Sequence, residues 1–144
     1  MRFLETVKEG LYYETEQMLK KCKYLVYEYD KQHMTALHWA ALRNHHTLIP
    51  LLLDYGAKID SFDIIGWTPL YLAGKYKNKE SVIELLCNKA WPSARIHGKM
   101  SAIDIDNDNI KKAEILHICL KWAPKSARGD VWAQEGINYF KGKK

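Results

Sequence analysis

The stretch Thr35-Ala36-Leu37-His38-Trp39-Ala40-Ala41 recurs 33 residues later as Thr68-Pro69-Leu70-Tyr71-Leu72-Ala73-Gly74. The same shift places Asp30 on Asp63, and it aligns the second half of each unit without a gap. A further shift keeps the polar, small and apolar residue classes in register, although the identities fade. A fixed period of this length is typical of stacked helical repeats, which bind partners through an extended face.

The repeated unit resembles the ankyrin repeat, whose pattern reads roughly D-x-x-G-x-T-P-L-H-x-A-A and then a second helix ending in L-L-x-x-G-A. Residues 30–60 match it best, with M-T-A-L-H-W-A-A and L-L-L-D-Y-G-A-K-I-D. The resemblance implies an all-α ankyrin-repeat solenoid of stacked helix-turn-helix units with short turn fingers. We expect this domain over residues 1–123. Its units are expected at about 2–29, 30–62, 63–95 and 96–123, the first and last of them degenerate.

Local signals within the units place helix ends. Thr35, Thr68 and Ser101 suit helix N-caps, and Pro69 suits the first helical position. Gly56 falls where a helix C-cap requires a positive φ. Its counterpart Lys89 lacks the freedom of glycine, so we expect a differently shaped turn there. The resemblance implies that His38 links neighbouring turns by hydrogen bonds, whereas Tyr71 and Asp104 replace this histidine in the later units.

The register predicts which side chains a partner can reach. The tip Ile64-Ile65-Gly66-Trp67 places three large apolar side chains where polar residues usually lie, and exposed apolar area marks interaction sites. Alternatively, Ile64 or Ile65 folds back onto the neighbouring turn or under Phe62. The residues predicted to bind a protein partner are Met34, Leu42, Arg43, Tyr55, Ile64, Ile65, Trp67, Lys75, Tyr76, Trp132, Tyr139 and Phe140.

The last three of these residues belong to an aromatic and basic segment, residues 124–144. It holds five Lys or Arg and two acidic residues, so it accounts for most of the formal net charge of +5. Disordered tails are usually poor in aromatic residues. We therefore expect this C-terminal tail either to pack along the repeats or to dock on another protein.

Composition argues against several other functions. Lysines outnumber arginines 18 to 4, and arginine forks are the usual device for reading phosphates or bases, so nucleic-acid binding is not expected. No apolar run is long enough for a signal peptide or a membrane span, so secretion and direct membrane insertion are not expected. The cysteines Cys22, Cys87 and Cys119 are odd in number and far apart, which favours reduced, buried thiols in a cytoplasmic-type compartment.

The sequence also gives little evidence for a metal site or a catalytic site. His45-His46 and His117-x-Cys119 lack the ligand spacing of a zinc site, and no nucleophile motif or phosphate loop is present. We therefore expect no metal, no cofactor, no small-molecule substrate and no enzymatic activity. The favoured function is a small structural or adaptor subunit that binds proteins within a larger complex. The alternative is an ankyrin-type regulator that inhibits or delivers one signalling partner.

Overall fold

A computed structural model describes residues 2–90 and residues 115, 118, 119, 121 and 122. Six α-helices and one 3₁₀ helix lie within residues 2–90, and residues 115, 118, 119 and 121 are also helical. They are α1 (Phe3–Lys8), α2 (Tyr12–Lys21), η1 (Lys23–Tyr27), α3 (Ala36–Leu42), α4 (Leu48–Asp54), α5 (Pro69–Lys75) and α6 (Lys79–Cys87). Apart from one antiparallel bridge between Tyr29 and Thr35, the described residues contain no strand. The predicted all-α helix-turn-helix solenoid is confirmed.

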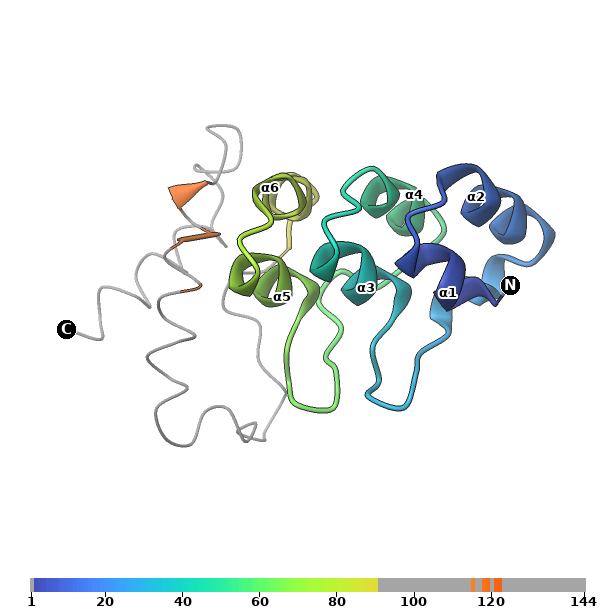
Figure 1. The fold of residues 1–144 in the computed structure, drawn as a ribbon, viewed down its shortest axis with the longest axis horizontal. Coiled ribbons are helices and arrows are strands. Elements are labelled where there is room, and N and C mark those ends of the chain that lie inside the picture. The colour runs from blue at the N-terminus through green and yellow to red at the C-terminus, as the bar shows by residue number, and fades with distance from the viewer. Residues whose placement is uncertain (1, 91–114, 116–117, 120, 123–144) are drawn as a thin grey trace.

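The helices form two rows. Figure 1 shows α1, α3 and α5 side by side in an inner row, with α2, α4 and α6 in an outer row. Two elongated loops project from the inner row, away from the outer one. We name them the first finger, residues 29–35, and the second finger, residues 62–68. The expected unit boundaries remain predictions, but each described helix pair falls inside one expected unit.

The beginnings of α3 and α5 follow the sequence signals. Thr35 accepts a hydrogen bond from the His38 backbone amide, and Thr68 accepts one from the Tyr71 amide. Pro69 occupies the first helical position of α5, where its missing N–H group costs no helical hydrogen bond. Both predicted caps are confirmed, whereas Ser101 lies outside the described residues.

The ends of α4 and α6 correct one expectation. Gly56 has a φ of 96°, and Lys89 also adopts a positive φ, of 68°. After each helix, two backbone amides donate to carbonyls of the last turn in the same pattern: Gly56 to Leu53 and Ala57 to Leu52, then Lys89 to Leu86 and Ala90 to Leu85. The prediction of a different turn at Lys89 is wrong, because these two hydrogen bonds hold a lysine in the left-handed conformation.

Side-chain hydrogen bonds join successive units. The Asn78 amide donates to the carbonyls of Ala41 and Leu42 at 2.7 and 2.8 Å, and the Ser81 hydroxyl donates to Asn44 Oδ1 at 2.8 Å. The two Asn78 bonds satisfy carbonyls at the end of α3 that have no partner within their own helix. Hydrogen bonds between units therefore stabilise the stack in addition to its apolar core.

The cysteines differ from one another in burial. Cys119 is fully buried, and its thiol donates to the Leu70 carbonyl at 3.8 Å. Burial raises the pKa of this thiol to about 12, so it is inert at neutral pH. Cys22 and Cys87 are exposed free thiols at helix ends. The expectation that all three are buried is wrong, because Cys22 follows the end of α2 and Cys87 ends α6, and both side chains lie at the surface.

Candidate protein-binding surface

Each finger is built around one aspartate. Asp30 Oδ1 accepts from the amides of Gln32 and Met34 at 2.9 and 3.0 Å, and its Oδ2 accepts from Trp39 Nε1 at 3.0 Å.

In the second finger, Asp63 Oδ1 accepts from the amides of Ile65, Gly66 and Trp67 at 3.0, 2.9 and 2.8 Å. Hydrogen bonds to a carboxylate are stronger than those between neutral groups, so both fingers hold a fixed backbone.

His38 links the second finger to the inner row. Its Nδ1 lies 3.2 Å from the Thr35 amide and accepts that hydrogen, so Nε2 donates to the Trp67 carbonyl at 2.8 Å. Burial lowers the pKa of His38 below its ordinary value of 6.5, although the bond to Trp67 opposes the shift. The predicted link between neighbouring turns is confirmed, and the neutral imidazole makes it.

The two fingers also pair directly. The Ile64 amide donates to the Gln32 carbonyl at 2.9 Å, next to the tips of both loops. The side chains at the second tip remain in solvent, since Ile64 is 64% exposed and Ile65 is 49% exposed. The alternative that either isoleucine folds back onto its neighbours is wrong. The second finger therefore presents two apolar side chains on a rigid backbone.

Two predicted surface residues lie inside the molecule. Met34 is 6% exposed and Trp67 is 8% exposed, and both belong to the hydrophobic core. The Trp67 indole packs edge-on against Tyr71, with ring centroids 6.2 Å apart. The expected exposure of both side chains is wrong, because this position in each finger faces the inner helix instead of solvent.

One cation, Lys75, extends the surface beside the second finger. Lys75 Nζ lies 5.0 Å from the centroid of Trp67 and 5.7 Å from that of Tyr76, which is itself 53% exposed. Cation–aromatic contacts of this kind hold a flexible ammonium in one place. We name Ile64, Ile65, Lys75 and Tyr76 the finger surface.

A second cation–aromatic cluster lies one unit away, where Lys8 Nζ is 4.2 Å from the Trp39 ring and Arg43 Cζ is 5.7 Å from it. Sequence reasoning included Arg43 and missed Lys8 and Trp39. Trp39 could have been selected from the sequence, because it belongs to the repeated heptapeptide. In the structure its indole donates to Asp30. The exposed Arg43 also donates to the Lys8 carbonyl at 3.3 Å, so it partly serves to join α3 to α1.

The remaining predicted positions fall into two groups. Leu42 and Tyr55 are half-buried and pack against the core, so they contribute only an edge to any binding surface. Trp132, Tyr139 and Phe140 lie outside the described residues, as does the whole segment 124–144. Across the part of the chain that the structure describes, no helix is long and apolar enough to cross a membrane.

Comparisons with known proteins agree with this geometry. A family model for ankyrin repeats, in three copies, matches residues 11–97, more than half of the chain. A palmitoyltransferase, ZDHHC17 of Danio rerio, is 52% identical over 50 residues, which is 34% of this chain and 8% of that protein.

Two further relatives are named for regulation. A Notch-regulated ankyrin repeat-containing protein of Xenopus tropicalis is 29% identical over 91 residues, covering 61% of this chain and 79% of that protein. Protein phosphatase 1 regulatory subunit 27 of Homo sapiens is 31% identical over 71 residues, covering 49% of this chain and 46% of that protein.

The similarity lies within the repeats, and the aligned part is only 8% of the palmitoyltransferase. The helices α2 to α6, the aspartate-built fingers and the histidine link all lie within the residues that the family model matches. The chain therefore belongs to the ankyrin-repeat family and is built as a protein–protein interaction module.

Proposed function

We propose that the chain is a non-enzymatic adaptor subunit that binds a protein of a larger assembly through the finger surface. The exposure of Ile64 and Ile65 carries the proposal. Neither side chain supports the finger backbone, which Asp63 and His38 hold through their own hydrogen bonds. A pair of isoleucines at a rigid tip has a physical use in contact with an apolar pocket of a partner.

The energetics of such a contact are favourable. Complete burial of a largely exposed isoleucine is worth about 2 kcal/mol, and tyrosine is enriched among the residues that dominate interfaces. Lys75 adds a charge that lies over the rings of Trp67 in the second finger and of Tyr76. The partner patch that fits these groups is apolar at its centre and acidic at one side.

A regulator of a single signalling partner is the second candidate. The names of two relatives, a phosphatase regulatory subunit and a Notch-regulated protein, favour it. An adaptor needs at least two separate binding surfaces, whereas a regulator needs only one. We propose a reducing compartment for either role, in the cytosol or in a cytoplasmic assembly such as the cytoskeleton or a cilium. The exposed free thiols of Cys22 and Cys87 support this location.

Cross-linking mass spectrometry on native material tests the proposal. We expect cross-links from Lys75 to another protein, and we expect the double variant Ile64→Lys/Ile65→Gln to lose that protein in a pull-down. The control is Tyr13→Lys, which changes an exposed side chain of α2 far along the chain from the tip. Retention of the partner by the double variant would exclude the finger surface, and a chain without any cross-linked protein would exclude the adaptor.

A further inference from the structure

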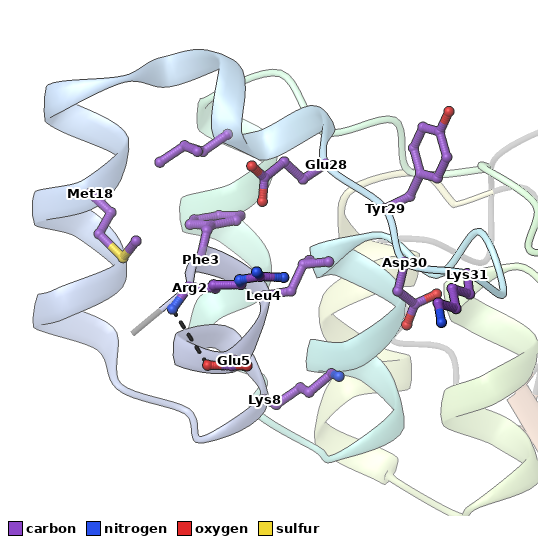
Figure 2. Close-up of a pocket in the computed structure, with 11 residues that line it drawn as sticks. Arg2, Phe3, Leu4, Glu5, Lys8, Met18, Glu28, Tyr29, Asp30 and Lys31 are labelled. Atoms are coloured by element: carbon purple, nitrogen blue, oxygen red, sulfur yellow. Dashed lines mark hydrogen bonds between the residues drawn. The ribbon is translucent and has the colours of Figure 1, made fainter.

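A cavity of about 1040 Å³ lies at the N-terminal end of the stack, between α1, α2, η1 and the first finger. Figure 2 shows Phe3 and Leu4 of α1 facing it, Met18 on one side, and Tyr29, Asp30 and Lys31 of the first finger on the other. Leu25 completes an apolar floor with Phe3, Leu4 and Met18. We name this space the N-terminal cavity.

The pairing of the two fingers shows which hydrogen bond is missing beside the N-terminal cavity. The second finger attaches to the first because the Ile64 amide donates to the Gln32 carbonyl. Lys31 stands 33 residues before Ile64, at the same place in its own finger. No described residue accepts a hydrogen bond from the Lys31 amide, and the residue itself is exposed.

The amides that follow Lys31 at the tip of the first finger are satisfied. Gln32 and Met34 donate to the Asp30 carboxylate, and His33 donates to the Asp30 carbonyl. Among residues 30–35, Lys31 is therefore the one whose amide has no acceptor in the described part of the chain, and it lies beside the apolar floor. Between the two fingers the corresponding donor, the Ile64 amide, is satisfied by the Gln32 carbonyl, and Met34 of the first finger is buried in the core.

We propose that the N-terminal cavity binds a finger-like turn of another polypeptide. The turn supplies a backbone carbonyl to the Lys31 amide, as Gln32 does for Ile64, and a large apolar side chain to the floor. In both fingers of this chain a core residue follows two positions after the tip carbonyl, Met34 after Gln32 and Trp67 after Ile65. We expect the same spacing in the occupant.

The rim of the cavity favours recognition by shape over recognition by charge. Arg2, Lys8 and Lys31 are cationic, and Glu5 and Glu28 are acidic. The third carboxylate, Asp30, is saturated by its own finger and by Trp39. A turn with mixed charge fits this rim better than a strongly acidic or basic one. The N-terminal cavity is separate from the finger surface, and the proposal does not depend on the function proposed for the finger surface.

The test uses the full chain and a synthetic peptide with the sequence of residues 28–36, which carries the Gln32 carbonyl and the Met34 side chain. We expect a saturable shift of the Lys31 amide resonance in the ¹⁵N-labelled protein at millimolar peptide, and hydrogen exchange of that amide slowed about tenfold. A peptide with Asp in place of its methionine is the matched control and should leave the resonance unmoved.

Protein variants locate the peptide. Met18→Glu, or Leu4→Gln if the first variant loses helicity, should abolish the shift, whereas Ile64→Lys on the second finger should leave it intact. An unmoved Lys31 amide at millimolar peptide would overturn the proposal. A shift that survives both cavity variants would overturn it as well, because the peptide would then bind elsewhere.

Discussion

The two fingers have the same backbone construction, but one tip is polar and the other is apolar. Asp30 and Asp63 each fold a loop by accepting backbone amides at 2.8–3.0 Å. The first tip carries the polar pair Lys31-Gln32, and the second carries the apolar pair Ile64-Ile65. The backbone is therefore indifferent to the tip side chains, which leaves them free to specify a partner. Four predictions test this difference between the two fingers.

Removal of the finger aspartates should have the largest effect. Asp63→Ala removes the carboxylate that accepts from three backbone amides, of which only Gly66 keeps another acceptor, the Asp63 carbonyl at 3.1 Å. We expect the free energy of unfolding to fall by about 3 kcal/mol, because the Ile65 and Trp67 amides lose their acceptor. Asp30→Ala should cost a similar amount, since it releases two amides and the Trp39 indole. Urea denaturation measures both changes, with the exposed Asp54→Ala as the control. A loss below about 1 kcal/mol would show that the fingers do not depend on their aspartates.

Much of this construction was predictable from the sequence. The helix pairs, the Thr35 and Thr68 caps and the turn at Gly56 follow from short-range patterns that determine local backbone geometry. The link made by His38 was implied by the resemblance to the ankyrin repeat, because its partner lies 29 residues away. The direction of Met34 and Trp67 was not predictable in this way. A finger has no helical period, so the side chain that faces the core is selected by the turn that Asp63 folds.

Tertiary contacts decided the other differences. Lys89 takes a left-handed conformation that its residue type disfavours, because a pair of backbone hydrogen bonds outweighs the preference. Lys75 is placed by two aromatic rings, one of which comes from the finger before its own helix. The open Lys31 amide could be recognised only after the pairing of Ile64 with Gln32 was seen.

The second prediction concerns Gly66, which occupies the place of His33 in the first finger. Gly66 has a φ of 100°, beyond the left-handed region that other residues tolerate, whereas His33 has a φ of 58° within it. We expect Gly66→Ala to lower the free energy of unfolding by about 2 kcal/mol. His33→Ala should change it by less than about 1 kcal/mol, through loss of the stacking on Tyr29. Equal effects in thermal denaturation would show that the two fingers are not distinguished by backbone strain.

The third prediction uses pH to weaken the link between the second finger and the inner row. The pKa of His38 is lowered in the folded state by burial, so the unfolded chain takes up the proton first as pH falls. The stabilising contribution is complete above the ordinary pKa of 6.5 and decreases from there down to the native pKa, by at most about 1.4 kcal/mol per pH unit.

Unfolding of the native chain and of His38→Gln between about pH 5 and pH 7.5 isolates this effect, since other groups titrate alike in both proteins. The native chain should lose more stability than the variant as pH falls. Parallel curves would mean that His38 carries the same charge in the folded and unfolded states.

The smallest effect on stability is expected from exchange of the tips. Ile64→Lys/Ile65→Gln copies the first tip onto the second finger, and the free energy of unfolding should change by less than about 0.5 kcal/mol, because both side chains lie mostly in solvent. The measurement is again urea denaturation, with Lys31→Ile/Gln32→Ile as the reciprocal exchange. A large loss would show that the isoleucines support the fold. It would contradict the proposal that they are exposed in order to contact a partner protein. An unchanged stability would mean that the fold does not depend on apolar residues at this tip, which leaves both side chains free to contact a partner.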